Sequence, residues 1–487
     1  MELTKVLQDV KTIEVSADLS LDIKGVTQNS RNIKEGCIFV ALKGARFDGN
    51  SFIPSAMEMG AVCIVTDTKP TSSVPYVLVD DPRKALSLML SNFYGRPQDS
   101  FKLSVGVTGT NGKTSTTMML KNIFEESGCK VGLIGTMKYL IGDEEYNSES
   151  EGNLLTTPDS ENFWALLGTM RDKGVEVLVM ETSSHALALD KIYGMHFSCG
   201  IFTNLTRDHL DFHGDFEHYL EAKAKLFSMC DVGIVNEDDP ACEELKKLAK
   251  CPIKTYSIDR DSSDYTAKNT KLKGAIGVEY ELLTESLIFR IRVDIPGRFT
   301  VYNSLAAASA ALTLGVGCDT IIKAFVRTNR IEGRVDRVDI DAPYSVIIDF
   351  AHTPDAMVNV INTVRAFAEA RIITLFGCGG DRDRTKRPIM GQLATDMSDH
   401  VIITSDNSRS EKKDAIIADI LAGITKDNYT VIPDRKEAIC RAMDMAQQGD
   451  VVLCLGKGHE EDEIDEFGKH RFSEYEIVTE YYNEGKK

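Results

Sequence analysis

The sequence predicts an α/β protein of three domains, built on parallel sheets with helices on both faces. Short runs of apolar, β-branched residues alternate with helical patterns along most of the chain, which is typical of βαβ units. The runs are continuously apolar, as strands are when helices cover both faces of a sheet. The 487 residues are enough for about three domains of ordinary size.

Seven apolar runs are the expected strands of these sheets. They are LSVGVT (103–108), VEVLVM (175–180), GIFTN (200–204), VIIDF (346–350), RIITLF (371–376), VIIT (401–404) and VVLCL (451–455). The segment LIFRIRVDIPG (287–297) differs, because apolar Phe289, Ile291, Val293 and Ile295 alternate with Arg290, Arg292 and Asp294. Successive side chains of a strand point to opposite faces, so this pattern predicts a strand with one solvated face.

Two segments rich in turn-forming residues divide the chain. YGRPQDS (94–100) precedes the first central strand, and RTNRIEGRVDRV (327–338) joins a helix-rich stretch to a new βαβ series. We therefore expect boundaries near residues 99 and 331. The predicted domains are an N-terminal α/β domain (1–99), a central P-loop ATPase-like parallel-sheet domain (100–331) and a C-terminal Rossmann-like α/β domain (332–487).

Charge and composition exclude several classes of protein. Lys and Arg number 56 and Asp and Glu 74, a formal charge of −18 that argues against duplex nucleic acid or an anionic membrane as the main partner. The 11 cysteines are scattered without a C-x-x-C pair, so we expect neither a disulfide framework nor a zinc ribbon. The sequence shows no targeting segment and no apolar span. We expect a cytoplasmic monomer without membrane insertion.

The segment VTGTNGKTSTT (107–117) predicts a phosphate-binding loop, because it follows an apolar strand and opens an amphipathic helix that Gly128 ends. The backbone N–H groups of such a loop bind a triphosphate, Lys113 reaches the terminal phosphates and the Thr114 hydroxyl holds Mg²⁺. Val107 stands where the general pattern has its first glycine, and a tight strand-to-helix turn is the alternative. The predicted ATP-binding residues here are Gly109, Thr110, Asn111, Gly112, Lys113, Thr114 and Ser115.

Three segments together resemble the Mur ligase family: GTNGKTS (109–115), METSSHAL (180–187) and FTNLTRDHLDFHGDFEHYLEAKAKLF (202–227). The resemblance implies that Glu181 and His209 hold a second Mg²⁺ and that Lys223 is carbamylated. A carbamate is an anionic oxygen ligand, whereas a free lysine would repel a metal ion. The resemblance thus makes Lys113, Glu181, His209 and Lys223 catalytic, and the predicted metal ligands are Thr114, Glu181, His209 and carbamylated Lys223.

Two other interpretations apply to these residues. An ordinary solvated lysine is the alternative for Lys223. A zinc site is the alternative for His209, His213 and His218, which have helical spacing. Because Gly214 interrupts that spacing and no cysteine is near, we expect His209 to bind metal and the other two histidines to pack.

Further motifs follow in the order of the family. VYNSLAAASAAL, EGRVDRV and DFAHTPDAM resemble its nucleotide-contacting segments, which adds Asn303, Arg334, Asp349 and His352 to the ATP site. TQNSRNIKEGCIFVALKGARFDGNSFI resembles its UDP-binding stretch, with Asn29 where an aspartate is commoner, and TTP (156–158) resembles the muramyl-peptide segment. Lys191 replaces a usual arginine and lacks the bidentate fork. The implied UDP-muramyl-peptide residues are Ser30, Arg31, Thr156, Thr157, Ser184 and Lys191.

Within the family, the C-terminal domain selects the amino acid that is added. The implied binding residues are Arg387, Asp406, Asn407, Arg409, Gly456 and Glu460. Relatives that use meso-diaminopimelate carry D-N-P-R at the place of DNSR (406–409), and Arg409 suits the second carboxylate of that amino acid, which lysine lacks. Ser408 replaces the proline, so the loop regains an N–H and the freedom of φ.

The resemblance implies an ATP- and Mg²⁺-dependent amide ligase of peptidoglycan precursor synthesis. It would add meso-diaminopimelate to the D-glutamate γ-carboxylate of UDP-N-acetylmuramoyl-L-alanyl-D-glutamate through an acyl phosphate. The first alternative is the same ligase with L-lysine or another diamino acid. The remoter alternatives are a folylpolyglutamate synthase-like ligase and a nonenzymatic sensor of nucleotide and cell-wall precursor.

Overall fold

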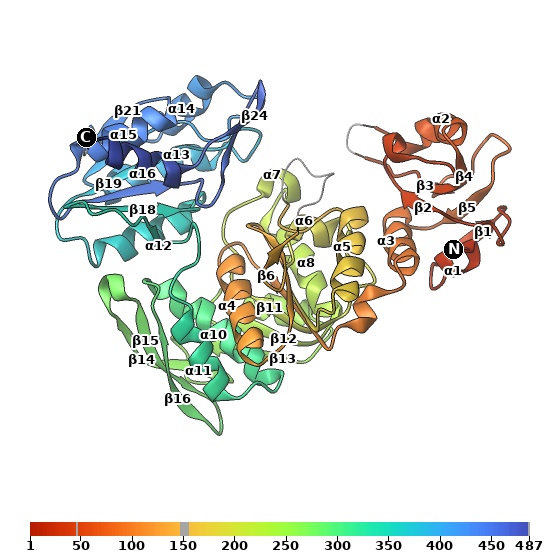
Figure 1. Ribbon diagram of the computed structural model, residues 1–487, viewed down its shortest axis with the longest axis horizontal. Helices are drawn as coiled ribbons and strands as arrows, with labels where there is room; N and C mark the ends of the chain where they lie inside the picture. Colours follow the sequence, from red (N-terminus) through yellow and green to blue (C-terminus); the bar gives the residue numbers. More distant parts are fainter. Residues whose placement is uncertain (45–46, 147–154, 486–487) are drawn as a thin grey trace.

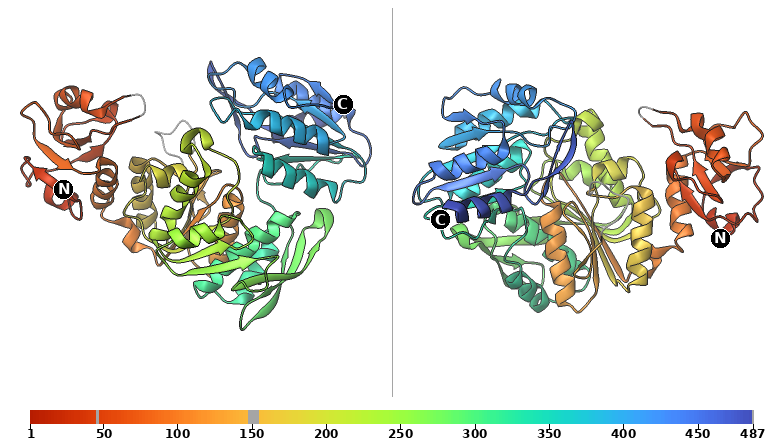
Figure 2. Two further views of the ribbon diagram at one scale, coloured as in Figure 1. Left: turned by 180° about the vertical axis from the view of Figure 1, so that it is seen from behind. Right: turned by 45° about the horizontal axis from the view of Figure 1, so that its top comes forward.

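The computed structural model describes residues 1–44, 47–146 and 155–485. Three helix-covered sheets follow one another along the chain, and Figure 1 shows the first (red) and the last (blue) on either side of the central one. The two further views in Figure 2 show the same order. The predicted α/β class with three successive sheets is confirmed.

The N-terminal sheet has five strands in the order β1-β5-β4-β3-β2, all parallel except the edge strand β1. The longest helix here, α3, begins where Asp81 accepts hydrogen bonds from two backbone N–H groups and Pro82 fills the first turn. The elements are α1 (Leu3–Val6), β1 (Thr12–Val15), β2 (Gly25–Thr27), β3 (Cys37–Val40), α2 (Ile53–Glu58), β4 (Ala61–Thr66), β5 (Tyr76–Val79) and α3 (Pro82–Phe93).

The central sheet has eleven strands in the order β16-β15-β14-β13-β12-β11-β6-β10-β7-β8-β9. The central part of this sheet, from β14 through β13, β12, β11, β6 and β10 to β7, is parallel. Antiparallel strands extend it at both ends, β15 and β16 beyond β14 and β8 and β9 beyond β7. Its strands are β6 (Leu103–Thr108), β7 (Val131–Ile134), β8 (Tyr139–Ile141), β9 (Glu144–Glu145), β10 (Val177–Glu181), β11 (Phe197–Phe202), β12 (Cys230–Asn236), β13 (Ile253–Ser257), β14 (Tyr265–Leu272), β15 (Val278–Leu283) and β16 (Ile288–Val293). Its helices are α4 (Lys113–Glu126), α5 (Ser160–Asp172), α6 (Ser184–Ala188), α7 (Leu210–His213), α8 (Phe216–Ala224), α9 (Cys242–Leu248), α10 (Arg298–Thr313) and α11 (Cys318–Arg327).

The C-terminal sheet has the order β17-β18-β22-β19-β20-β21 and is parallel apart from β17, with a separate hairpin of β23 and β24. Its strands are β17 (Asp336–Arg337), β18 (Ser345–Asp349), β19 (Ile372–Phe376), β20 (His400–Ile403), β21 (Tyr429–Val431), β22 (Val451–Leu455), β23 (Asp462–Asp465) and β24 (Gly468–Arg471). Its helices are α12 (Pro354–Arg365), α13 (Lys386–Met397), α14 (Lys413–Leu421), α15 (Arg435–Met445) and α16 (Glu474–Gly485).

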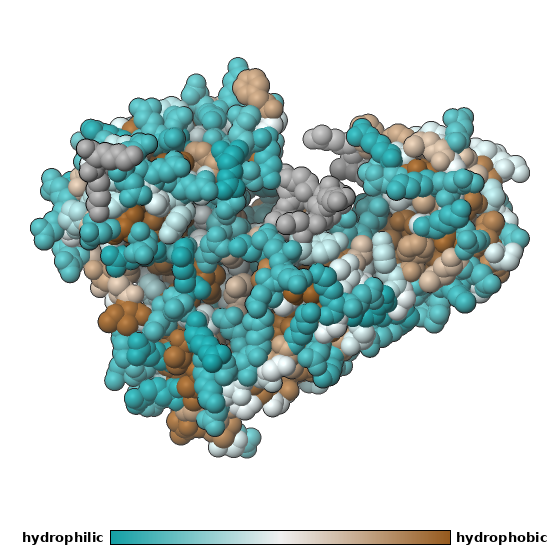
Figure 3. All heavy atoms as spheres, viewed as in Figure 1, coloured by the Kyte–Doolittle hydropathy of each residue, from teal (hydrophilic) through white to brown (hydrophobic). Residues whose placement is uncertain are grey.

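All seven predicted apolar strands are present, and their central residues are buried. The alternating segment forms β16 as predicted, with Ile291 and Val293 buried while Arg290 and Arg292 are exposed. Figure 3 shows hydrophobic residues gathered near this end of the central sheet, where Ile288 is 71% exposed. Within the described residues, no helix is long and apolar enough to cross a membrane.

Candidate active site

The predicted phosphate loop connects β6 to α4. Gly109 and Gly112 have φ of +147° and +85°, and a Cβ at Gly109 would lie 1.9 Å from Thr203 Oγ1, so both the backbone conformation and the space require glycine. Lys113 Nζ donates to the carbonyls of Gly109 (3.0 Å) and Thr110 (2.9 Å). Burial lowers the pKa of Lys113. This side chain is therefore folded over the loop, at the place where a terminal phosphate would accept its hydrogen bonds.

Other loop residues are held by neighbouring segments. Asn111 accepts at its carbonyl from Thr203 Oγ1 (2.6 Å), and its side chain donates to Asp355 Oδ2 at 3.1 Å. Thr110 Oγ1 lies 3.1 Å from the Tyr219 hydroxyl. Thr114 and Ser115, at the start of α4, are buried. Asp355 belongs to α12, so the C-terminal domain contacts the phosphate loop directly.

Four predicted nucleotide residues come from other elements. Asn303 of α10 is buried against the loop, its Oδ1 2.4 Å from where a Cβ of Gly112 would be. Arg334 Nη2 donates to Thr114 Oγ1 at 3.1 Å. Asp349 ends β18 and accepts two backbone N–H groups at 2.7 Å, and burial raises its pKa. His352 Nε2 lies 3.6 Å from Asp208 Oδ2 of the central domain. The structure thus gathers these side chains where the central and C-terminal domains meet.

The predicted metal ligands converge from three elements beside this loop. Glu181, at the end of β10, is 1% exposed, and its carboxylate accepts from the backbone N–H (3.0 Å) and hydroxyl (2.9 Å) of Thr136. His209 precedes α7 with a φ of +54°, and burial lowers its pKa to about 3, so its ring is neutral at pH 7. Among the described residues no three His, Cys, Asp or Glu side chains form a metal-binding cluster. Glu181 and His209 therefore do not form a complete metal site by themselves.

Lys223 is buried (1% exposed) on α8, and no carboxylate of the described chain pairs with its Nζ within 4.0 Å, although the charge of Asp208 acts on it from farther away. The Nζ lies 4.3 Å from the centre of the Tyr219 ring. Burial and then the charge of Lys113 hold the pKa of Lys223 well below its ordinary value. Burial therefore favours the neutral amine, the form that reacts with CO₂ to give a carbamate. The expectation that His218 packs is wrong, because it lies on the exposed side of α8 and pairs with Asp215. His213, by contrast, contacts the Tyr219 ring, with the ring centres 4.8 Å apart.

The residues predicted to hold the UDP-muramyl peptide lie in two places. Ser30 and Arg31 form a 3-10 turn (Ser30–Asn32) in the N-terminal domain, where Asn29 Oδ1 accepts from the Arg31 N–H at 3.1 Å. The others lie in the central domain. Thr156 Oγ1 is 3.0 Å from Thr136 Oγ1, Thr157 Oγ1 donates to the Glu181 carbonyl at 2.8 Å, Ser184 Oγ is 2.9 Å from His213 Nε2, and Lys191 Nζ is 2.5 Å from Asp159 Oδ1.

Most of the residues predicted to bind the added amino acid form one cluster in the C-terminal domain, made of Asp406, Asn407, Arg409, Gly456 and Glu460. Asn407 donates from Nδ2 to Glu460 Oε2 at 2.8 Å and accepts from Lys457 Nζ at 3.0 Å. A Cβ at Gly456 would lie 2.6 Å from Asp406 Oδ2. Burial opposes the charge of Asp406, yet Lys457 and Arg435 hold its pKa below the ordinary value. Lys457 also pairs with Glu460 Oε2 at 3.3 Å, so this side of the cluster holds two carboxylates and the protein's own ammonium group.

Arg409 adds a guanidinium to the cluster. It has a φ of +52°, its N–H donates to the Ile464 carbonyl of β23 at 3.0 Å, and its Nη1 donates to the Gly380 carbonyl at 2.8 Å. No carboxylate of the described chain pairs with this guanidinium within 4.0 Å, and the side chain is only partly buried. Burial, and then the charge of Arg382, lower the pKa of Arg409. The cluster therefore places a guanidinium that has no carboxylate of the described chain within 4.0 Å near the carboxylates of Asp406 and Glu460, whose charges act on it from farther away.

Arg387 is predicted to bind the added amino acid, but carboxylates of the protein itself occupy its guanidinium. Its side chain is fully buried, and it donates to Glu411 (2.8 and 2.9 Å), Asp419 (2.8 Å) and the Gly379 carbonyl (3.1 Å). These partners neutralise the guanidinium within the domain. Sequence reasoning missed Arg382 and Lys457, which lie in the segments 377–390 (GCGGDRDRTKRPIM) and 456–461 (GKGHEE) together with the predicted residues Arg387, Gly456 and Glu460. It also missed Asp355, which no local pattern distinguishes from a helix-capping aspartate.

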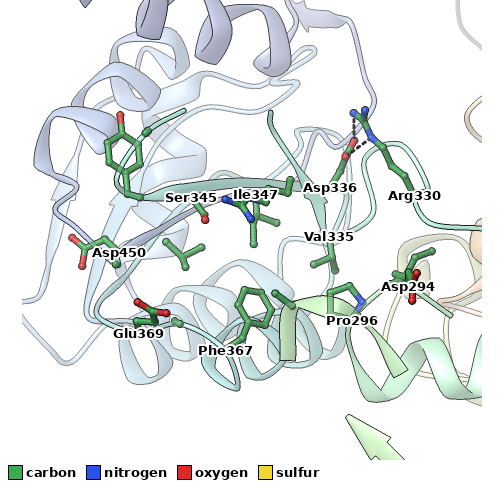
Figure 4. Close-up of a pocket in the computed structure, with 18 of the residues that line it drawn as sticks. Asp294, Pro296, Arg330, Val335, Asp336, Ser345, Ile347, Phe367, Glu369 and Asp450 are labelled. Carbon is green, nitrogen blue, oxygen red and sulfur yellow. Dashed lines mark hydrogen bonds and ion pairs between the residues drawn. The ribbon is translucent and has the colours of Figure 1, made fainter. Parts of the chain in front are cut away.

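Two cavities flank the link between the central and C-terminal domains. One of about 590 Å³ is lined by Thr114 and Glu181 at the site and by residues of the β7–β8 hairpin. The other, of about 440 Å³, is lined by the link itself and by C-terminal residues such as Phe367 (Figure 4), and the ion pair between Arg330 and Asp336 borders it. Val335 lines this second cavity and donates its N–H to Asp349. The first cavity adjoins the phosphate loop and belongs to the site described above.

Fold and site together define a three-domain α/β protein with a P-loop nucleotide site shared by its second and third domains. The sequence matches three family models: the Mur ligase family catalytic domain (22–94), the Mur ligase middle domain (107–311) and the Mur ligase glutamate ligase domain (333–458). The chain belongs to the Mur ligase family.

Curated relatives match over nearly the whole chain. The protein named UDP-N-acetylmuramoyl-L-alanyl-D-glutamate--2,6-diaminopimelate ligase of Clostridium tetani is 41% identical over 99% of this chain and 100% of its own. A protein of the same name from Clostridioides difficile is 42% identical over 99% of both chains. A solved structure of an enzyme with that name has a TM-score of 0.71 and 28% identity, covering 100% of this chain and 99% of that one.

More distant solved structures share the fold. MurF from Thermotoga maritima in complex with ADP has a TM-score of 0.61 and 20% identity, covering 94% of this chain and 97% of that one. Folylpolyglutamate synthase from Mycobacterium tuberculosis has a TM-score of 0.61 and 17% identity, covering 75% of this chain and 91% of that one.

Proposed function

We propose that this chain is an ATP-dependent ligase that adds 2,6-diaminopimelate, in its meso form, to the D-glutamate γ-carboxylate of UDP-N-acetylmuramoyl-L-alanyl-D-glutamate. This is a step of peptidoglycan precursor synthesis. The relatives at 41% and 42% identity carry the name of this activity over the full length of the chain. The L-lysine, folylpolyglutamate synthase-like and sensor alternatives have no such support.

The observation that carries the choice of amino acid is the guanidinium of Arg409, which contacts two carbonyls and no carboxylate of the described chain within 4.0 Å. The far end of diaminopimelate is itself an amino acid, with one ammonium and one carboxylate. Asp406 and Glu460 suit the ammonium, and Arg409 suits the carboxylate through a bidentate pair. L-lysine has no carboxylate at that end, so it would leave Arg409 without a paired carboxylate.

The chemistry begins with activation of the substrate carboxylate, because an ammonium and a carboxylate do not condense in water. An oxygen of the γ-carboxylate attacks the γ-phosphorus of ATP, the bond to the β-phosphate oxygen breaks, and an acyl phosphate and ADP result. The neutral amine of diaminopimelate then attacks the acyl carbon and loses a proton. The tetrahedral intermediate expels inorganic phosphate and leaves the amide.

The chain's own residues bind and orient these anions. Lys113 exchanges its two loop carbonyls for terminal phosphate oxygens, and Arg334, already bonded to Thr114, adds a second cation from the domain link. Contacts of Asp355 and His352 with the central domain keep the C-terminal domain over the phosphate loop. Domain contact of this kind holds the amine near the acyl phosphate and excludes water that would hydrolyse it.

The residues present fit two Mg²⁺ ions. We propose that Thr114 holds one of them at the phosphate loop and that Glu181, His209 and carbamylated Lys223 hold the second. The buried carboxylate of Glu181 and the unprotonated His209 are suitable donors, and the buried Lys223 becomes an oxygen donor once carbamylated. The bound ions supply charge stabilisation to the phosphate oxygens.

We also propose the predicted roles of the remaining residues and the predicted boundaries. The domains 1–99, 100–331 and 332–487 fit the gaps between sheets, since β5 ends at Val79, β6 begins at Leu103 and β17 begins at Asp336. We expect the chain to be a monomer in the cytoplasm. Light scattering on the purified chain measures its oligomeric state. A stable dimer would contradict the expected monomer.

Phosphate release from Mg-ATP and UDP-N-acetylmuramoyl-L-alanyl-D-glutamate tests the function, with meso-diaminopimelate, L-lysine or L-ornithine added separately and the product mass determined. We expect release and an amide product with diaminopimelate. Preference for lysine would keep the ligase and overturn the interpretation of Arg409. If no phosphate is released with any of the three amino acids, the proposed substrate is refuted.

A further inference from the structure

One carboxylate joins the two places where the predicted UDP-muramyl-peptide residues lie. Glu161, in the first turn of α5, accepts from the Gln28 N–H at 2.9 Å and from Thr27 Oγ1 at 3.1 Å to each oxygen. Thr27 ends strand β2 of the N-terminal domain, and the turn with Ser30 and Arg31 follows directly. Glu161 therefore links the central domain to the turn with Ser30 and Arg31, the predicted uridine end of the substrate site.

Glu161 has no compensating cation. No Lys, Arg or His nitrogen of the described chain pairs with its carboxylate within 4.0 Å, and burial raises its pKa. A partly buried carboxylate that depends on hydrogen bonds alone is costly to keep unless those bonds are made. The hydrogen bonds from Thr27 and Gln28 therefore stabilise the Glu161 carboxylate in this place. The many exposed ion pairs of this chain contribute less to holding two segments together.

The segment before Glu161 is anchored at the peptide end. Thr157 Oγ1 donates to the Glu181 carbonyl at 2.8 Å and accepts from the Ser183 N–H at 3.0 Å. Asp159 pairs with Lys191 Nζ at 2.5 Å. The short stretch from Thr157 to Glu161 is therefore held at both ends. Thr157 is bonded beside the proposed metal site, and Glu161 is bonded beside the uridine turn.

We propose that Glu161 is a positioning residue that sets the distance and angle between the uridine end and the peptide end of the substrate site. It thereby favours UDP-linked substrates whose length matches that spacing. This inference rests on the proposed function, because it assigns the two ends to one substrate.

The uridine turn also has hydrogen bonds of its own. Asn29 Oδ1 accepts from the Arg31 N–H, and the Asn29 N–H donates to Thr27 Oγ1 at 3.0 Å, both within the N-terminal domain. Loss of Glu161 should therefore leave the binding of UDP alone unchanged. It should weaken a ligand that must reach both ends at once.

The test compares Glu161→Ala, Glu161→Gln and Thr27→Val in the full chain. Glu244→Gln, an exposed glutamate in the first turn of α9, is the matched control. KM is measured for UDP-N-acetylmuramoyl-L-alanyl-D-glutamate, for ATP and for diaminopimelate, with kcat, and UDP affinity is measured by calorimetry.

We expect Glu161→Ala to raise KM for the UDP-muramyl substrate about tenfold or more, with kcat, the other two KM values and UDP affinity changed less than about twofold. Glu161→Gln, which keeps one acceptor, should recover part of the loss. Thr27→Val also removes the acceptor of the Asn29 N–H in the uridine turn, so it should lower UDP affinity as well, whereas Glu161→Ala should not.

An unchanged KM for the UDP-muramyl substrate would overturn the proposal, and so would an equal loss of UDP affinity, which would place Glu161 in the uridine site itself. A parallel rise of all three KM values together with a lower Tm would show a merely structural role. Failure of the proposed function is distinct, since the unsubstituted chain would then release no phosphate with this substrate.

Discussion

Replacing Arg409 by alanine is the sharpest perturbation of the amino-acid cluster. The structure gives its guanidinium two carbonyl contacts, to Gly380 (2.8 Å) and Asn407 (3.3 Å), and no carboxylate partner within the described chain. The distal carboxylate of bound diaminopimelate would thus lose its cation in the variant. Removal of one partner from a desolvated charge pair costs about 2–5 kcal/mol, which corresponds to a fall in kcat/KM of about 30- to 5,000-fold.

The assay is phosphate release at fixed Mg-ATP and UDP-muramyl dipeptide, with diaminopimelate or L-lysine varied. Lysine has no distal carboxylate, so its slow turnover should change little or rise in Arg409→Ala. The variant Arg441→Ala, which removes an exposed arginine of α15, is the control for loss of a positive charge. Diaminopimelate turnover within about threefold of the unsubstituted chain, or equal losses with both amino acids, would refute the reasoning.

The remaining predictions concern the phosphate loop, the modified lysine, pH and the core. Lys113→Ala should lower amino-acid-dependent ADP formation about 100-fold or more, while circular dichroism stays unchanged; near-normal turnover would contradict the phosphate site. Native mass spectrometry should find the mass of one CO₂ on the unsubstituted chain and not on Lys223→Ala, whose activity should fall at least about tenfold. His459 lies in the loop that follows β22 (Val451–Leu455). Burial and then the charge of Arg334 lower its pKa from 6.5 to about 3, so only the unfolded chain binds a proton at this residue as the pH falls through 6.5. The free energy of unfolding should therefore decrease between about pH 7 and pH 4, and less steeply in His459→Gln, as urea titrations at both pH values would measure. Trp164 is fully buried and donates to Ser87 at 2.9 Å, so Trp164→Ala should cost about 3–5 kcal/mol in urea denaturation; a loss below about 1 kcal/mol would contradict this packing.

Local features of the molecule could be predicted because they depend on neighbours in the sequence. The strand β6, the glycines of the phosphate loop and the helix α4 with its end at Gly128 are of this kind, since periodicity and positive φ are local constraints. The alternation in β16 predicted which of its side chains are buried. The family resemblance predicted the order of the motifs.

Partners that are distant in the sequence could not be predicted. The contact of Asp355 with Asn111 joins residues 244 positions apart, and that of Glu161 with Thr27 joins residues 134 apart. Arg387 lies in a motif that the family resemblance covers, yet only packing gave it Glu411 and Asp419 as partners.

The sequence by itself determined the α/β class, the phosphate loop and the family, because short patterns of apolar, glycine and charged residues encode strands, turns and binding loops locally. The tertiary structure alone decided which charges are neutralised inside the protein and which remain for a ligand. Arg387 and Arg409 have the same chemistry and lie in neighbouring motifs, but one is enclosed by carboxylates and the other is not. That difference arises because β19 and β20 lie side by side and bring the segments that follow them together, and electrostatic compensation depends on distance in space rather than on separation along the chain.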